Sequence, residues 1–366
     1  MAQPPRPILA VEDDPFLRLL QVILDPLAPP ERVAAFAHFM EHDEPDFAGW
    51  CERLRRRVTP LYPAEVRLAR DPDELRAGLP GAAVIVVEGL PVGAAEIQAA
   101  GGTLKLIQKY GTLTRGIDRA ACEQTGVRVL TIRRRANIAT AEHAFALLLA
   151  LARKIPETAN RVSDEQLRAA GYSPTRYDRA HTPNGNWGRI TGLKTLYGRV
   201  LGIVGFGEIG REVAARAAAF GMRILYTQRR RADADDEERL QARYCNLREL
   251  LAESDFVTLH LPGGPETRGI IGRRELEAMK PGALLVNVSQ PHLVDRRALI
   301  EALASGRLGG FGLDTHYEEP GRADDPLLAL RNVIVTPHLG GSPRANALAD
   351  FEEMLTRLAR ALQEAY

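Results

Sequence analysis

The chain has 366 residues, of which 45% are hydrophobic and 26% charged, so it is long enough for two domains of an ordinary globular protein. Its net charge of +1 argues against a nucleic-acid partner, and its longest apolar run, 144–152, is shorter than the roughly 18 residues of a membrane span. Three widely separated cysteines without metal-ligand spacing, and an N-terminus without an apolar signal core, predict reduced thiols, no metal and a cytoplasmic location.

The N-terminal third alternates short β-rich runs with helical stretches. This alternation predicts an α/β fold with a parallel sheet. The expected strands are Ile8–Val11, Ala83–Val87, Leu104–Gln108 and Val127–Thr131.

Two segments interrupt the pattern. Residues 26–63, rich in proline, charge and aromatics, are expected to form an insertion with one or two helices. The RLRRR run inside it is interpreted as a solvated helix face, with an anion site as the alternative. A buried helix is expected over 141–154 because that stretch is apolar almost all round and Pro156 follows it. Residues 163–192 carry many turn formers and predict a long surface excursion.

A glycine-rich turn begins the second half of the chain. The strand RVLGIVGF leads into Gly205-Phe206-Gly207-Glu208-Ile209-Gly210, and a helix is expected over 208–220. Glycines in this context permit a tight turn, close approach of the backbone to a pyrophosphate, and close packing of helix on strand. The free amides of the helix N-terminus favour phosphate. We therefore predict a dinucleotide site at Gly205, Gly207, Glu208, Ile209 and Gly210.

The end of the next expected strand, MRILYT, bears on the choice of dinucleotide. An acid about 20 residues beyond the glycines normally binds the ribose hydroxyls of NAD. Here the chain reads Gln228-Arg229-Arg230-Arg231, and arginine forks suit a 2′-phosphate. We predict that NADP(H) is preferred through Arg229 and Arg230 with Gln228 beside them, and that NAD(H) remains possible. A solvated basic loop next to the acidic run 233–238 is the alternative.

Further strands are expected at 256–259, 283–288, 309–313 and 332–336, and a last helix over 344–363. From Leu104 onward the segments LKLIQKYGTLTRGIDRAACEQTGVRV, ANIATAEHAFALLLALAR, LLAESDFVTLHLPGGPETRGIIGRRELEAMKPGALLVNVS, GLDTHYEEP and NVIVTPHLGG resemble, in order, those of the D-isomer-specific 2-hydroxyacid dehydrogenases. The resemblance implies two Rossmann-like domains. A flavodoxin-like substrate domain would comprise 1–135 and 338–366, and an inserted doubly wound dinucleotide-binding domain 136–337. It also implies a homodimer and a small-molecule substrate.

The resemblance assigns roles to individual residues. His338 matches the general acid–base histidine and Glu319 the glutamate that supports it. The cofactor positions carried over are Pro262, Thr267, Asp314 and Gly340. The substrate loop corresponds to Gly111, Thr112 and Leu113.

Two departures stand out against the resemblance. In the substrate loop, Leu113 and Arg115 stand where the family commonly has a second glycine and an aspartate. The family's arginine, which clamps the substrate carboxylate, is replaced by Gln290, which forms no charged bidentate pair. Arg115, or Lys109, is a candidate for supplying the missing charge, and a solvated loop residue is the alternative for Arg115. Catalysis at this site would involve His338, Glu319, Gln290 and Arg115.

The function implied is hydride transfer between NAD(P) and a small 2-hydroxy or 2-oxo acid or a related carbonyl compound. A catalytically impaired cofactor-binding or sensor protein of the same fold is the alternative. The opening ILAVEDDPFLRLL also resembles a phosphoacceptor receiver domain, but no aspartate follows a strand about fifty residues on.

Overall fold

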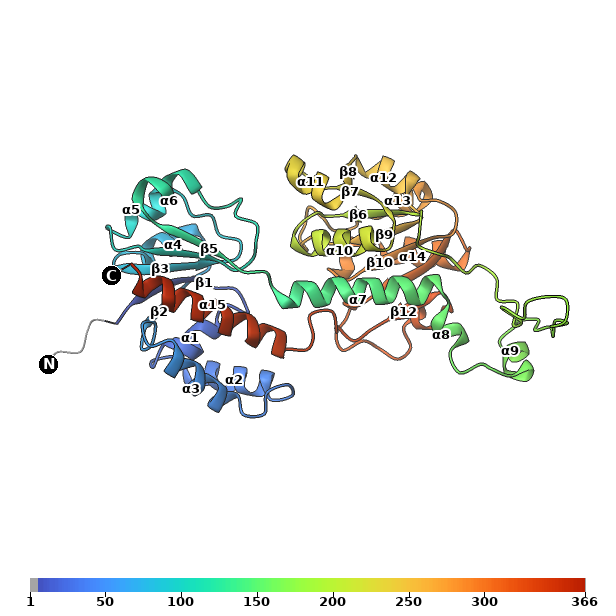
Figure 1. Ribbon diagram of the computed structural model, residues 1–366, viewed down its shortest axis with the longest axis horizontal. Helices are drawn as coiled ribbons and strands as arrows, with labels where there is room; N and C mark the ends of the chain where they lie inside the picture. Colours follow the sequence, from blue (N-terminus) through green and yellow to red (C-terminus); the bar gives the residue numbers. More distant parts are fainter. Residues whose placement is uncertain (1–5, 366) are drawn as a thin grey trace. The chain divides into compact units, whose positions relative to one another are not determined.

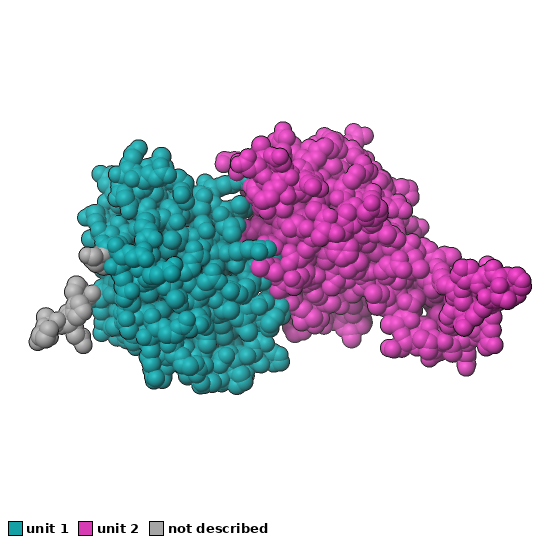
Figure 2. Space-filling model, viewed as in Figure 1, with its two compact units in different colours: residues 1–137, 341–366 teal, residues 138–340 magenta. Residues whose placement is uncertain are grey.

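The computed structural model describes residues 6–365, which form two compact units. Unit 1 comprises the chain up to Asn137 together with the segment from Gly341 onward, and unit 2 comprises Ile138–Gly340 (Figure 2). Both are parallel α/β layers, as the alternation of strands and helices predicted (Figure 1).

Unit 1 is built on a five-stranded parallel sheet of order β2-β1-β3-β4-β5. Its strands are β1 (Ile8–Glu12), β2 (Glu65–Ala69), β3 (Ala82–Val87), β4 (Leu106–Lys109) and β5 (Arg128–Thr131). Its helices are α1 (Leu19–Leu24), α2 (Pro30–Met40), α3 (Phe47–Arg57), α4 (Pro72–Gly78), α5 (Ala94–Ala99), α6 (Arg119–Thr125) and α15 (Ala345–Gln363). The four expected strands are confirmed with small shifts of their ends, and β2 was not expected.

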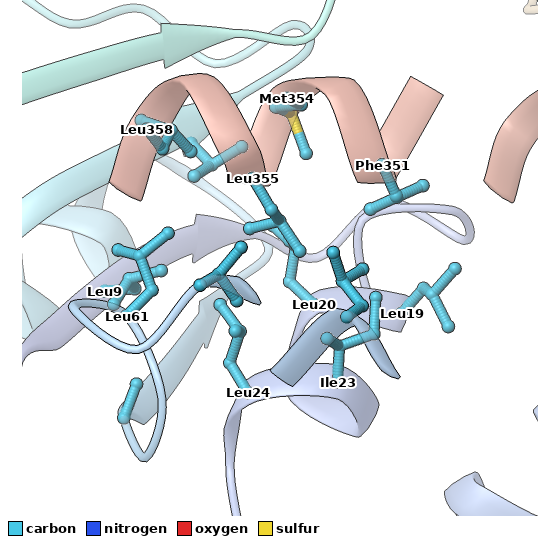
Figure 3. Close-up of a cluster of buried hydrophobic side chains, with 14 of the residues drawn as sticks. Leu9, Leu19, Leu20, Ile23, Leu24, Leu61, Phe351, Met354, Leu355 and Leu358 are labelled. Carbon is cyan, nitrogen blue, oxygen red and sulfur yellow. The ribbon is translucent and has the colours of Figure 1, made fainter. Parts of the chain in front are cut away.

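The last helix completes the core of unit 1. Side chains of α15 point toward α1 and the strands, where they meet Leu9, Leu20 and Leu61 (Figure 3). Phe351 and Leu355 on this helix are fully buried. Burying each such side chain stabilises a fold by roughly 1.5–3 kcal/mol, so unit 1 depends on a segment far away in the sequence.

The insertion 26–63 contains two helices, α2 and α3, in agreement with the expectation. Asp46 caps the N-terminus of helix α3, because its carboxylate accepts the Gly49 amide. Within the RLRRR run, Arg53 pairs with Asp46, whereas Arg55 donates to the carbonyls of Val22 and Ile23. The run is thus partly a solvated face of α3, but Arg55 binds carbonyl groups in the last turn of α1.

The acids of the opening segment are used by the fold itself. One carboxylate oxygen of Glu12 accepts the amides of Glu88, Gly89 and Leu90 at 2.6–2.9 Å. Asp14 accepts the amide of Phe16 at 2.8 Å. Among residues 6–365 no group of three His, Cys, Asp or Glu residues could hold a metal ion. These contacts give no support to a receiver-domain function.

Unit 2 is built on a seven-stranded parallel sheet of order β12-β11-β10-β9-β6-β7-β8. Its strands are β6 (Val200–Val204), β7 (Arg223–Thr227), β8 (Ala242–Tyr244), β9 (Phe256–Leu259), β10 (Ala283–Asn287), β11 (Leu308–Leu313) and β12 (Val333–Val335). Its helices after β6 are α10 (Glu208–Ala219), α11 (Ala234–Leu240), α12 (Leu247–Glu253), α13 (Arg273–Ala278) and α14 (Arg296–Ala304), with 3-10 turns η1 (Pro291–Leu293) and η2 (Pro326–Ala329).

Helix α7 (Arg135–Ala152) precedes the sheet of unit 2 and packs its buried face into that unit's core. After it the chain forms α8 (Ile155–Thr158) and α9 (Asp164–Ala169), and residues 155–195 extend away from the sheet of unit 2 (Figure 1). The expected excursion therefore includes one short helix, which Ser163 and Gln166 cap reciprocally. None of the described helices is long and apolar enough to cross a membrane.

Candidate active site

The glycine-rich turn joins β6 to α10, and each glycine there has a different surrounding. Gly205 has φ +98°, and a Cβ on it would lie 2.4 Å from the carbonyl oxygen of His260. A Cβ on Gly210 would lie 2.2 Å from the carbonyl oxygen of Gly205. At Gly207, the N-cap of α10, a Cβ would meet nothing within 4 Å. Two glycines are thus required by the protein's own packing, while the space at Gly207 is open for a ligand.

This turn lies at the point where the order of the sheet reverses. The chain runs from β6 to β7 on one side, whereas the next long strand, β9, lies on the other side of β6. In open α/β sheets ligands bind outside the carboxyl ends of the strands at such a point. The predicted residues Gly205, Gln228, Gln290, Asp314 and His338 all follow the carboxyl ends of unit 2 strands.

The segment after β7 contains one unpaired buried donor and one unpaired exposed cation. The side-chain nitrogen of Gln228 is buried and has no hydrogen-bond partner among residues 6–365. Arg229 pairs with Glu266 at 2.9 Å and Arg231 with Glu237 at 2.8 Å. Arg230 is exposed, and no ion pair to it is found in the described part of the chain. Gln228 and Arg230 are therefore available to a ligand.

His338 and Glu319 form a pair on neighbouring loops. Nδ1 of His338 lies 3.0 Å from a carboxylate oxygen of Glu319, whose other oxygen accepts the amide of His316 at 2.9 Å. Burial raises the pKa of Glu319, but these hydrogen bonds outweigh burial and hold it below its usual value. An ionised carboxylate only accepts, so Nδ1 of His338 carries the hydrogen and Nε2 is left for proton exchange.

The backbone around His338 is held by Asp314. His338 has φ +57°, an uncommon conformation for a side chain other than glycine, and its amide donates to the Asp314 carbonyl. The buried Asp314 carboxylate accepts from Thr336, from the amides of Leu339 and Gly340 at 2.7–2.8 Å, and contacts His143 at 3.1 Å. Burial raises the pKa of Asp314, but these donors lower it to about 2.

Asp314 and Gly340 therefore fix the loop of His338. A Cβ on Gly340 would lie 2.8 Å from the Asp314 carboxylate, so only glycine allows this approach. With four donors around it the carboxylate has its accepting capacity filled. The role of these two residues toward a cofactor stays a prediction.

Gln290 and the turn 262–268 lie together. The Gln290 side chain covers Gly263, where a Cβ would lie 2.8 Å from its Cγ. Thr267 closes the turn by donating to the carbonyl of Pro262 at 2.8 Å. Asn287 donates to the Gln290 carbonyl at 2.9 Å, which fixes the backbone but leaves the exposed carboxamide free to reorient.

The predicted substrate-loop residues lie in unit 1, after β4. Gly111 has φ +153°, and its carbonyl accepts the Ile132 amide at 3.0 Å; Thr112 is exposed and Leu113 half-buried. Lys109 donates to the carbonyl of Glu88, so its ammonium already has a partner. Arg115 is exposed, and no ion pair to it is found among the described residues. Of the two proposed sources of positive charge, Arg115 is the one available.

Comparison with known proteins identifies the family to which the chain belongs. Residues 145–340, more than half of the chain, match the NAD binding domain of the D-isomer specific 2-hydroxyacid dehydrogenases. The chain belongs to this family. It is 39% identical over 246 residues to a glyoxylate reductase of Korarchaeum cryptofilum, a match that covers 67% of this chain and 69% of that protein. It is 35% identical over 286 residues to a D-3-phosphoglycerate dehydrogenase of Archaeoglobus fulgidus, which covers 76% of this chain but 49% of that protein.

Solved structures of the family agree in fold. A protein of Thermus thermophilus is 34% identical with a TM-score of 0.52, covering 86% of this chain and 94% of that one. D-mandelate dehydrogenase of Rhodotorula graminis is 25% identical with a TM-score of 0.55, covering 97% of this chain and 94% of that one. The chain is thus an oxidoreductase of the 2-hydroxyacid dehydrogenase family with two Rossmann-like domains, of which unit 2 is the NAD binding domain.

The residues present fit such a cofactor. The open space at Gly207 admits a phosphate to the amides that begin α10, and the unpartnered buried nitrogen of Gln228 lies after the next strand, where a ribose would be expected.

Several residues of the site were missed by the sequence reasoning. His143 on α7 bonds Thr336 at 2.9 Å as well as Asp314, yet its partners lie far away in the sequence. The imidazole of His316 contacts Asp325, which in turn pairs with Arg296 at 2.7 Å. A lone histidine in an apolar helix was the available signal for His143, and it does not point to a partner.

Proposed function

We propose that the protein interconverts a small 2-oxo acid and its 2-hydroxy acid, with NADP(H) preferred over NAD(H). The His338–Glu319 pair, placed on the same sheet edge as the glycine-rich turn, is the observation that carries this proposal. Glyoxylate is the first substrate to test because the relatives aligned over two thirds of their length are named glyoxylate reductases.

The residues of the site have separate tasks. Bound nicotinamide would supply or accept the hydride. Nε2 of His338 gives a proton to the substrate oxygen during reduction and takes it back during oxidation. Glu319 fixes the orientation of the imidazole by accepting the hydrogen of Nδ1 at 3.0 Å. Gln290 offers a neutral amide to the substrate carboxylate.

Single-turnover oxidation of NADPH and NADH tests the proposal. The purified protein is mixed with glyoxylate, pyruvate or hydroxypyruvate, and absorbance of the reduced nicotinamide is followed. We expect turnover with at least one acid and none with acetate, which has no carbonyl at C2. Absence of turnover with every 2-oxo acid, while the nucleotide still binds, would refute the proposal.

The preference for NADP(H) is proposed on the free guanidinium of Arg230. Arg229 and Arg231 are paired with acids, so Arg230 is the group most able to meet a 2′-phosphate. We expect Arg230→Ser to weaken NADPH binding about tenfold, or about 1.4 kcal/mol, and to leave NADH binding unchanged. Arg223→Ser, an exposed residue at the amino end of β7 and so at the opposite end of the strand, is the control. Equal affinity of the wild type for NADPH and NADH would refute the proposed preference for NADP(H).

Gln290 favours a second candidate, a protein that binds the cofactor without turnover. Removal of a group that stabilises developing charge costs on the order of 10²–10³ in rate. We propose instead that Arg115 supplies the charge. If so, Arg115→Ala abolishes turnover. The second candidate is supported instead if Arg115→Ala leaves the rate unchanged and Gln290→Arg gains activity.

A homodimer and a cytoplasmic location complete the proposal. Ile155 and Val162 on the segment 155–195 are 51% and 78% exposed, which suits an interface between two copies. Sedimentation of Val162→Glu should show a shift toward monomer. All three cysteines are buried and unpaired, as expected in a reducing compartment.

A further inference from the structure

The insertion between α1 and β2 forms one side of a pocket that lies entirely in unit 1. The pocket, about 750 Å³ in volume, is lined by the loop after β1, helix α2 and the start of α15. Its apolar walls include the rings of Phe16, Phe36 and Phe39. Phe16 and Phe39 meet edge to face with centroids 6.4 Å apart, and Phe39 is 39% exposed. Both the volume and the aromatic lining are those of a small-molecule site.

The charged groups of this pocket are predominantly positive. Arg18 is neutralised by Asp13 at 2.6 Å. By contrast, Arg32 donates to the side-chain oxygen of Gln21, and Arg344 donates to the carbonyl of Phe39 and covers its ring at 4.1 Å. Neither guanidinium forms an ion pair with a carboxylate within the described residues.

The acids near these two arginines do not neutralise them. Glu31 also lines the pocket, but it is exposed. Asp43 accepts the backbone amide of Arg344, and His38 contacts Glu41 at 3.8 Å. Two guanidiniums paired only with neutral oxygens thus face an apolar cavity, and an anion would complete their hydrogen bonding.

The topology of the unit 1 sheet supports a ligand at this position. Strand β1 lies between β2 and β3, so the chain reverses direction across the sheet at β1. The pocket begins at Pro15, just beyond the carboxyl end of β1 at Glu12. Ligands of open α/β sheets bind outside the carboxyl ends of strands at such a reversal.

We propose that this pocket binds a small amphipathic carboxylate, an anion with an aromatic or branched apolar body. The body packs against Phe16, Phe36 and Phe39, and the carboxylate pairs with Arg32 and Arg344. A neutral apolar compound would leave the guanidiniums without an anion, and an anion without an apolar body would leave the rings in water. Because every group belongs to unit 1, the proposal does not depend on the reaction proposed above.

Calorimetric titration of the full chain, with and without saturating NADPH, tests the site. The probe is 3-phenylpropionate, which has no 2-oxo group to be reduced, and the matched compounds are propionate and 3-phenylpropanamide. We expect both matched compounds to bind about tenfold more weakly than the probe, or about 1.4 kcal/mol each. Equal affinity for all three compounds, or no binding of the probe at millimolar concentration, would overturn the proposal.

Variants assign the binding to this pocket. Arg32→Gln and Arg344→Gln should each weaken the probe about fivefold or more, whereas Arg56→Gln, on the exposed face of α3, should not. Ala35→Trp fills the cavity without removing a hydrogen bond and should abolish binding even if Arg344→Gln fails to fold. Binding unchanged in both Arg32→Gln and Ala35→Trp, with folding verified by circular dichroism, would place the ligand elsewhere and refute the proposal.

Discussion

The acids around His338 in unit 2 and two arginines of the unit 1 pocket differ in how the fold pairs them. In unit 2, Asp314 accepts four donors and Glu319 is held by His316 and His338. In unit 1, the guanidiniums of Arg32 and Arg344 meet only neutral oxygens. The acids that hold the loop of His338 are saturated by the fold, whereas Arg32 and Arg344, for which we propose a ligand, have no acid partner. Substitution of a saturated acid on the unit 2 edge should therefore disturb structure as well as rate, and substitution of Arg32 or Arg344 in unit 1 mainly binding.

The largest effect is expected at His338, where the comparison predicts a loss of rate with the fold intact. His338→Gln should lower kcat by about 10²–10⁴, because proton transfer contributes that much, and should leave nucleotide affinity unchanged. Steady-state kinetics measure kcat, and fluorescence titration measures the nucleotide affinity. His181→Gln, an exposed histidine on the segment 155–195, is the control. Wild-type turnover in His338→Gln would break the assignment.

Two single substitutions in the glycine-rich turn distinguish a glycine needed for packing from a glycine that leaves space for a ligand. Gly210→Ala forces a Cβ against the Gly205 carbonyl and should cost about 3 kcal/mol of unfolding free energy. Gly207→Ala places its Cβ in open space, so stability should hold while nucleotide binding weakens. Urea unfolding and fluorescence titration distinguish them. Equal stability of the two variants would contradict the close packing described at Gly210.

The hydrogen bonds that Asp314 accepts predict that the free energy of unfolding depends on pH. Its folded pKa of about 2 lies below the ordinary 3.8, so its stabilisation is present above pH 4 and is lost as pH falls through 2. Asp314→Asn should lose on the order of 2 kcal/mol at pH 7, and the gap to wild type should narrow toward pH 2. Urea unfolding at pH 7 and pH 3 measures this, with the exposed Asp324→Asn as control. A difference in stability between Asp314→Asn and wild type that does not change with pH would refute this prediction.

The smallest effect is expected at His316, a positioning residue for Glu319. Its ring contacts Asp325 at 3.1 Å, and its amide holds the Glu319 carboxylate. His316→Ala should lower kcat about fivefold, near 1 kcal/mol, with KM unchanged, because Glu319 would orient His338 less well. His316→Gln, which keeps a polar side chain beside Asp325, should recover part of the rate. A change in KM alone would indicate that His316 acts on binding instead.

Much of the fold was predictable because its strands are buried and regular. Strand β9 was located to the residue, and α15 to within one residue, since one is an apolar run and the other a strongly periodic amphipathic helix. Strand β2 was missed because two of its five residues are charged, and β8 because it has three residues. Edge strands have too few buried positions to produce a clear pattern.

The site was predictable where a motif fixes it and not where contacts join distant segments. The glycines of the turn from Gly205 to Gly210 follow from local spacing. The contact of His143 with Asp314 and that of His316 with Asp325 depend on how separate strands align, which no local pattern encodes. The pocket of unit 1 likewise joins residues near 16, 36 and 344.

The return of α15 to unit 1 has a consequence for synthesis on the ribosome. Unit 2, Ile138–Gly340, is complete before any residue of α15 is translated. Unit 1, although its strands emerge first, lacks the helix that buries Phe351 and Leu355 until then. At about 5–20 residues per second its nascent sheet waits many seconds with apolar surface uncovered. Unit 1, most of which is made first, therefore finishes folding only after the whole of unit 2 has been synthesised.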